Sequence, residues 1–410
     1  MARLARFAAA REEPRRAAAG VRAHRGIRSA GGRGQGLRGS PRQGRRQHGI
    51  PELCRHGARL HHHGPRAGHR QCRARGLRAG SAQGLAHGMK ADLKLRHGGR
   101  ILADALAAHG VRTAFGVPGE SFLPVLDGLH DLREKLRFVI CRQEGGASYM
   151  AEAGAKLSGE PGVLFVTRGP GATNGAVGVH TAHQDSTPML VFVGQVGNDF
   201  VEREAFQEVD YRRMYGPLTK WVAQIDRAER IPEYVSHAFH TATSGRPGPV
   251  LLALPEDMLF SDAAVADAPH FRTARAAPSP ADMQELERLL SGAKRPFVLI
   301  GGGGWTGRAI DGLRAWAEDC GVAVGCGFRC QDYFDNRHPN YAGDVGIGVN
   351  PKLAQRVKDA DVLLAIGERL GEMTTSAYTL LDVPAPKQTL IHVQSGAEEL
   401  GRVYRAALPI

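Results

Sequence analysis

The sequence predicts an α/β protein with two doubly wound domains, each built around a parallel sheet. Short apolar runs rich in Val, Ile, Leu and Phe alternate with helical segments from residue 98 onward. Turns rich in Gly and Pro separate these runs, a pattern typical of alternating strands and helices. Hydrophobic residues make up 42% of the 410 residues, which is enough to form a sizeable core in each domain.

The first domain is expected at residues 89–260. Residues 98–109 place apolar side chains on one helical face, and Gly110 is suited to end that helix. The run 111–117 predicts a strand that leads into a Pro-Gly turn. Further strands are expected at 137–141, 163–167, 189–193 and 249–254, and further helices at 122–132, at 147–157 and after the glycine-rich turn that follows residue 167.

A linker rich in Ala, Asp and Pro is expected at 261–280, and the second domain at 281–410. In the second domain a short strand runs into a glycine turn and then into a helix, as in Rossmann-like folds. Its helices are expected at 283–290 and 309–319, and its strands at 296–300, 322–324, 362–366 and 389–393.

The net charge of +13 is concentrated at the N-terminus. Residues 1–88 hold 20 of the 54 basic residues, all of them Arg, and three of the 41 acidic residues, so the remainder carries 34 basic and 38 acidic residues. Residues 1–88 lack the apolar periodicity needed for a core. They are interpreted as a disordered or spurious leader, such as GC-rich DNA read outside the true start. A nucleic-acid-binding arm is the alternative.

The six cysteines show no zinc-ligand spacing, which favours a reduced, cytoplasmic protein. No apolar run is long enough for a membrane span. We therefore expect neither a nucleic-acid partner nor a membrane partner for the globular part.

Seven short motifs follow one another in the first domain. They are GVPGE (116–120), RQEGGA (142–147), MAE (150–152), RGPGATN (168–174), DSTP (185–188), AFQE (205–208) and GRPGPV (245–250). Each motif alone is weak, but the ordered series resembles thiamine-diphosphate enzymes similar to acetolactate synthase. The resemblance runs from about residue 98 to the C-terminus. It implies a pyrimidine-binding domain followed by a Rossmann-like central domain.

The resemblance implies that Glu144 activates the cofactor. In the family a buried carboxyl bonded to N1′ of the pyrimidine promotes the tautomer that removes the C2 proton of the thiazolium ring. Apolar surroundings can tune such a carboxyl for acid–base work. Glu144 is expected where a strand meets a helix of Gly and Ala, so that a cofactor ring can approach. The alternative is a helix-start acid that stabilises the helix dipole.

Other cofactor-binding residues follow from the same resemblance. Turns rich in Gly and Pro expose backbone N–H groups at the start of a helix, and in the family these turns line the pyrimidine. The expected residues are Pro118, Gly119, Gly169, Gly171 and Asn174.

Four residues are expected along the substrate channel. Gln207 is expected to hydrogen-bond a keto acid and Lys220 to attract its carboxylate, so both are candidate catalytic residues. Phe206 and Arg168 are expected to line the channel, although acetolactate synthases usually carry Ser at the position of Arg168. The alternative for the 205–220 region is a solvated loop.

The glycine turn of the second domain fits the pattern G-x-G-x-x-G and is a candidate FAD or ADP site. Its candidate residues are Gly302, Gly303, Gly304 and Arg369. No acid follows the second strand where a ribose-binding residue usually stands. The segment GERLGE (367–372) also replaces the R-F-D-D-R run typical of FAD-holding members. FAD, an ADP group and a purely structural turn all remain open.

The family holds the cofactor's diphosphate and Mg²⁺ in a third domain marked by G-D-G and, about 25 residues later, N-N. The nearest match is Gly343-Asp344-Val345-Gly346, and no Asn-Asn follows it. We therefore expect that the C-terminal domain is absent, that this chain holds no metal, and that it is inactive alone.

The function implied by the resemblance is condensation or decarboxylation of 2-keto acids, with acetolactate formation from pyruvate as the preferred reaction. That reaction belongs to branched-chain amino acid biosynthesis. A homodimer or tetramer is expected, since the family's active site lies between subunits. The alternatives are another thiamine-diphosphate 2-keto acid or acyl-CoA decarboxylase, and a non-catalytic nucleotide-binding protein.

Overall fold

The structure is a computed structural model that describes residues 93–410. The predicted leader at 1–88 lies outside the described residues. Within them, two parallel six-stranded sheets confirm the predicted α/β class. No helix in this part of the chain is long and apolar enough to cross a membrane.

The first sheet has the strand order β3-β2-β4-β5-β7-β6, and every neighbouring pair is parallel. Its strands are β2 (Thr113–Gly116), β3 (Arg137–Ile140), β4 (Gly162–Val166), β5 (Met189–Gln195), β6 (Trp221–Gln224) and β7 (Pro249–Pro255). The central strands β4, β5 and β7 are buried along their whole length. Continuous apolar runs are typical of parallel strands covered on both faces.

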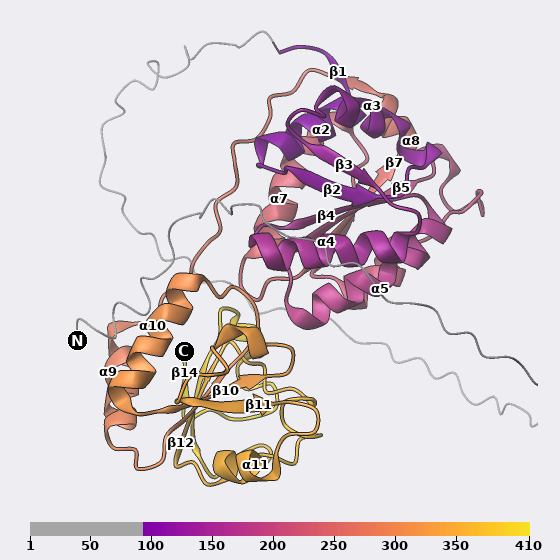
Figure 1. The fold of residues 1–410 in the computed structure, drawn as a ribbon. Helices are drawn as coiled ribbons and strands as arrows, with labels where there is room; N and C mark the ends of the chain where they lie inside the picture. The colour runs from indigo at the N-terminus through magenta and orange to yellow at the C-terminus, as the bar shows by residue number, and fades with distance from the viewer. Residues whose placement is uncertain (1–92) are drawn as a thin grey trace, which may run out of the picture. The chain divides into compact units, whose positions relative to one another are not determined.

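Helices cover both faces of this sheet (Figure 1). One face packs against α2 (Gly98–Ala108), α3 (Leu123–Asp131) and α7 (Ile231–Thr243). The other packs against α4 (Glu144–Ser158), α5 (Gly169–Asp185) and the short α6 (Tyr211–Tyr215). Alternate residues of each strand point to opposite faces, so Phe165 enters the first core and Leu164 the second.

The edges of this unit carry small elements. Strand β1 (Arg96–His97) pairs antiparallel with β8 (Asp262–Ala263), just after α8 (Glu256–Phe260). Short 3-10 helices are η1 (Glu120–Phe122), η2 (Asn198–Phe200), η3 (Gly216–Leu218) and η4 (Ala228–Arg230). The pairing of β1 with β8 ties the start of this unit to its end.

The second sheet has the order β11-β10-β9-β12-β13-β14 and is also parallel. Its strands are β9 (Phe297–Ile300), β10 (Ala323–Gly327), β11 (Tyr341–Val345), β12 (Val362–Ile366), β13 (Thr389–Val393) and β14 (Leu408–Pro409). Strand β9, which comes first in the chain among the strands of this sheet, stands between β10 and β12. The strand order therefore reverses there, at the point where such sheets usually bind ligands.

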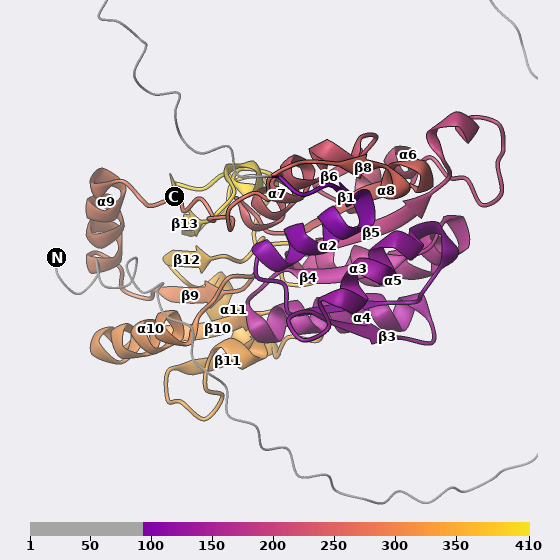
Figure 2. The ribbon, with the colours of Figure 1, turned by 90° about the horizontal axis from the view of Figure 1, so that it is seen from above.

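Helices α9 (Pro280–Ser291) and α10 (Gly307–Cys320) pack on one face of the second sheet, and α11 (Pro351–Lys358) on the other (Figure 2). A capping box at Ser279 and Asp282 starts α9. The 3-10 helices here are η5 (Gln331–Tyr333) and η6 (Ala397–Glu399).

The structure adds helices and strands that we did not predict from the sequence, namely β1, β6, β8, β11, β14, α6, α7, α8 and α11. It also places the predicted glycine-rich loop at 169–174 inside the first turns of α5. Pro170 is tolerated there because the first N–H groups of a helix have no intrahelical partner.

Candidate functional site

The carboxyl ends of three adjacent strands bring most of the predicted site residues together. Strands β3, β2 and β4 are neighbours in the sheet. Pro118 and Gly119 follow β2, Glu144 follows β3, and Arg168 and Gly169 follow β4. Residues far apart in the sequence therefore meet at one edge of the sheet, where parallel α/β folds usually bind ligands.

Glu144 is the first residue of α4. The Gln143 side chain caps the helix, its Oε1 accepting from Gly146 N–H at 2.9 Å. The Glu144 carboxylate is half-buried near the positive end of the helix dipole. Its Oε2 accepts a hydrogen bond from Asn174 Nδ2 at 3.1 Å. The structure thus holds the predicted activator and the predicted Asn174 in direct contact.

Small residues let α4 and α5 pack closely enough for this contact (Figure 1). Ser148 on α4 donates its hydroxyl to Gly145 O at 2.9 Å and accepts from Gly178 N–H of α5 at 3.2 Å. A Cβ on Gly178 would lie 2.6 Å from the carbonyl carbon of Ser148. Nearer the site, a Cβ on Gly171 would lie 3.4 Å from Glu144 Oε1.

Arg168 is buried, with 8% of its surface exposed. Its guanidinium donates to Phe206 O at 3.2 Å and pairs with Glu120 at 3.2 Å and Glu256 at 3.3 Å. Arg168 therefore ties the segment that carries Phe206 to the carboxyl edge of the sheet. We did not predict Glu256 from the sequence. It starts α8 directly after β7, and that position is the signal that would have found it.

Gln207 lies beside the start of α5. Gly169 N–H donates to Gln207 O at 3.0 Å, and Gln207 adopts a left-handed backbone with φ of 64°. Non-glycine residues rarely adopt this conformation, and they do so chiefly where surrounding contacts hold them. The Phe206 ring is 72% exposed, so it borders the site from the solvent side.

The carboxyl edge also holds two hydroxyl groups that sequence reasoning missed. Ser121 Oγ and Thr167 Oγ1 lie 2.9 Å apart, and the Thr167 side chain contacts the space beside Gly119 and Gly171. Thr167 comes directly after β4, and Ser121 lies two residues after Gly119. Their place after strand ends is the signal that could have found them.

Lys220 is not brought to this edge. It precedes β6, and the pairing of Trp221 with Val250 places it at the amino ends of the strands. Its Nζ donates to Thr241 O and Ser244 O, both at 2.6 Å, and so caps the C-terminal end of α7. Burial lowers the Lys220 pKa. These contacts are those of a helix cap.

The glycine turn of the second sheet lies where predicted, between β9 and α10. Gly302 and Gly304 have positive φ of 70° and 82°. Arg369 turns to Glu399, with Nε 2.9 Å from a carboxylate oxygen, and Glu399 is 3% exposed. The candidate residues therefore gather at the switch point of the sheet, but the Arg369 guanidinium is already paired with a buried carboxylate.

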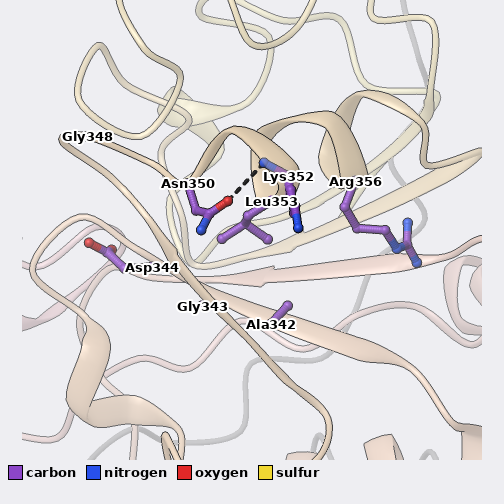
Figure 3. Close-up of a pocket in the computed structure, with 8 residues that line it drawn as sticks. All are labelled: Ala342, Gly343, Asp344, Gly348, Asn350, Lys352, Leu353 and Arg356. Carbon is purple, nitrogen blue, oxygen red and sulfur yellow. Dashed lines mark hydrogen bonds between the residues drawn. The ribbon is translucent and has the colours of Figure 1, made fainter.

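A cavity of about 530 Å³ lies beside β11 and the start of α11 (Figure 3). Asp344, from the nearest match to G-D-G, lines it together with Lys352 and Arg356. Asn350 Oδ1 accepts from Lys352 N–H at 2.9 Å. A carboxylate that shares the cavity with two cationic side chains is a poor donor set for Mg²⁺, which prefers carboxylate and phosphate oxygens. Within residues 93–410 no group of three or more His, Cys, Asp or Glu side chains could hold a metal ion.

Comparison with known families matches both domains. Residues 96–214 match the thiamine pyrophosphate enzyme N-terminal TPP binding domain, and residues 283–410 match the thiamine pyrophosphate enzyme central domain. Thiamine pyrophosphate, or TPP, is another name for thiamine diphosphate. The first match spans helices α4 and α5, which carry Glu144 and Asn174, and the second spans the glycine turn.

Curated relatives agree with this assignment. A probable acetolactate synthase large subunit of Methanocaldococcus jannaschii is 34% identical over 321 residues, which is 76% of this chain and 53% of the relative. The acetolactate synthase large subunit of Lactococcus lactis is 33% identical over 76% of this chain and 54% of its own length. The isozyme 2 large subunit of Escherichia coli is 31% identical over 76% of this chain and 56% of its own length. The chain therefore spans about half the length of the curated relatives it matches.

Both domain matches agree with the site at the carboxyl edge of the first sheet, where Glu144 contacts Asn174. The chain belongs to the thiamine pyrophosphate enzyme family and carries its N-terminal TPP binding domain and its central domain.

Proposed function

We propose that this chain supplies the cofactor-activating half of an enzyme that condenses 2-keto acids on thiamine diphosphate, as acetolactate synthases do. The observation that carries the proposal is the Glu144 carboxylate, held by Asn174 at the carboxyl edge of the first sheet. The acetolactate synthase names of the relatives support the reaction class.

The residues around Glu144 suit an aromatic ring with a basic nitrogen. Asn174 engages only Oε2 of the carboxylate. The other oxygen faces the glycine-lined start of α5, where the absence of a side chain at Gly171 leaves the approach open. A Cβ on Gly146 would meet no atom within 4 Å, so the first turn of α4 is also uncovered. Glu144 and Asn174 would hold the pyrimidine ring of the cofactor.

Glu144 would share a proton with the ring nitrogen, acting as a positioned acid–base group. When bound, the cofactor would supply a carbon nucleophile for the keto carbonyl. Asn174 orients the Glu144 carboxylate at the start of α4. Arg168 holds the Phe206 segment, and Gln207 beside it is proposed to contact the keto acid.

Lys220 has no part in this proposal, because its contacts place it at the other end of the strands. We propose that the diphosphate and Mg²⁺ are held by a further domain of the family. We also propose that FAD is not required, because the Glu368 side chain fills the space beside Gly301 of the glycine turn.

A homo-oligomer is proposed because apolar side chains stay exposed on the two helices next to Glu144. Tyr149 and Met150 of α4 are 45% and 42% exposed, and Val177 of α5 is 46% exposed. Neighbouring exposed apolar residues favour a protein interface. A cytoplasmic location is proposed from the four cysteines within residues 93–410, which are all free.

Product analysis with the complete enzyme, Mg²⁺ and thiamine diphosphate tests the proposed function. Two molecules of pyruvate are expected to give one acetolactate and one CO₂. Acetolactate is measured after acid conversion to acetoin, and CO₂ release is measured in parallel. Release of CO₂ without acetolactate would contradict the carboligase proposal and point to a simple decarboxylase.

A further inference from the structure

Glu368 occupies the ligand-binding position of the central domain. It lies two residues after β12, at the switch point between β9 and β12. Only 6% of its surface is exposed. Rossmann-like sheets bind the diphosphate of a dinucleotide in this crevice, against the glycine turn that follows the first strand.

Two glycines make room for the Glu368 carboxyl. A Cβ on Gly301, after β9, would lie 3.0 Å from Glu368 Cδ and would overlap Oε2. A Cβ on Gly327, at the end of β10, would lie 2.8 Å from Cδ and would overlap the same oxygen. The close backbone approach that these glycines permit is therefore used by a side chain of the protein itself.

The carboxyl is fixed by local hydrogen bonds. Leu370 N–H donates to Glu368 Oε1 at 3.2 Å, and Thr374 also bonds to the carboxyl. Thr374 Oγ1 in turn accepts from Phe328 N–H at 3.3 Å, next to the end of β10. Glu368 thus connects the carboxyl ends of three strands to the segment that follows β12.

Backbone carbonyls of the glycine turn also accept hydrogen bonds from two aromatic side chains. Trp305 Nε1 donates to Gly301 O at 2.8 Å, and Tyr333 Oη donates to Gly302 O at 2.7 Å. A Cβ on Gly302 would overlap Gly367 O. Gly301 and Gly302 pack against protein groups, so the space beside them does not fit a bound diphosphate, whereas Gly303 and Gly304 lie exposed.

We propose that the Glu368 side chain takes the place of a dinucleotide in the central domain, so that this enzyme works without FAD or an ADP group at its glycine turn. The inference stands independently of the reaction proposed above, because it concerns binding to the central domain alone. The Glu368 carboxyl lies where a dinucleotide would place its negative diphosphate, and the missing side chains of Gly301 and Gly327 leave the space for it.

Nucleotide binding by the full 410-residue chain tests this proposal. After desalting from excess FAD, the wild type is expected to retain no flavin absorbance, and titration with ADP is expected to show no saturation. The variant Glu368→Ala opens the space beside Gly301 and Gly327 and is expected to bind ADP at least about tenfold more tightly. Stoichiometric FAD or ADP on the wild type, or no gain in the variant, would overturn the proposal.

A double-mutant cycle tests the seating of Glu368 without any ligand. Gly327→Ala is expected to lower the Tm of the wild type clearly, because its Cβ collides with the carboxyl. In the Glu368→Ala background the same change is expected to cost much less, since the nearest remaining atom is Ile300 O at 3.4 Å. Gly307→Ala is the control, because its Cβ meets no atom within 4 Å. Equal losses in both backgrounds would show that Glu368 does not occupy this space.

The buried carboxyl also predicts a pH effect. Burial raises the Glu368 pKa, and the hydrogen bonds from Thr374 and Leu370 lower it by less, so that the pKa is about 7. The titratable and charged groups near it are Arg369, Cys330 and His392. Because the Glu368 pKa is higher in the folded state than in the unfolded state, the folded state binds more protons. The stability that the protonated Glu368 carboxyl contributes is therefore present at low pH and is lost as pH rises through about 7.

The variant Glu368→Gln keeps the acceptor oxygen but does not titrate. Its Tm is expected to match the wild type near pH 5 and to exceed it increasingly up to about pH 8. Thermal unfolding of both proteins across this range measures the difference. A constant difference at all pH values would show that Glu368 titrates alike in the folded and unfolded chains.

Discussion

Replacing Glu144 by Gln is expected to lower the turnover of the complete enzyme about 10²–10⁴-fold, the usual contribution of a positioned acid–base group. Gln keeps the shape of the side chain and can still accept from Asn174, but it cannot exchange a proton with the cofactor. The fold should survive, because the carboxylate is half-buried and its interaction with the helix dipole contributes only about 0.3–1 kcal/mol. Steady-state kinetics and thermal unfolding measure both effects.

Two further variants make the Glu144 experiment specific. Glu160→Gln removes an exposed carboxylate shortly after the end of α4 and should leave turnover unchanged. Asn174→Ala removes the hydrogen bond to Glu144 Oε2 and should lower kcat/KM by about fivefold, the equivalent of roughly 1 kcal/mol. Wild-type turnover in Glu144→Gln would remove Glu144 from the mechanism.

Replacing Gly178 by Ala is expected to destabilise the first domain by about 1–3 kcal/mol, the usual cost of overpacking a core. The new Cβ would lie 2.6 Å from both the carbonyl carbon and the Cβ of Ser148, and it would overlap the Ser148 hydroxyl. Two of these atoms belong to the backbone or lie next to it, so a rotamer change cannot relieve the contact. Helices α4 and α5 must separate, which would also lengthen the Asn174–Glu144 hydrogen bond.

Gly146→Ala is the matched control for this experiment. It lies on α4, and a Cβ there meets no atom within 4 Å. With no steric cost, the loss of backbone freedom in the unfolded chain should stabilise the protein by about 0.4–1 kcal/mol. Chemical unfolding of the three proteins gives the free energies. Equal stability of Gly178→Ala and the wild type would mean that α4 and α5 are not in such close contact.

The strands that carry the site could be predicted because their apolar runs are local and continuous. Strand β5 is buried at every residue, and its run of Met, Leu, Val and Phe predicts that burial. Helix α11 was missed because it is short, half of its residues are polar, and only Leu353 and Val357 are buried. The helical start of α5 was missed because Gly-Pro-Gly reads as a turn, whereas in the structure Ala172 N–H bonds to Arg168 O and Gly169 N–H to Gln207 O.

The sequence by itself determined the fold class and the family, because these depend on local apolar runs and on motifs that stand in a fixed order. The role of Glu144 stays a prediction from the same motifs. The tertiary structure alone decided which residues share an edge. Lys220 and Gln207 are close in the sequence, yet strand order and register place Lys220 at the amino ends and Gln207 at the carboxyl ends. The glycine turn left FAD, an ADP group and a structural turn open, and only the folded chain shows Glu368 in the space beside it, because the contact joins residues from three strands.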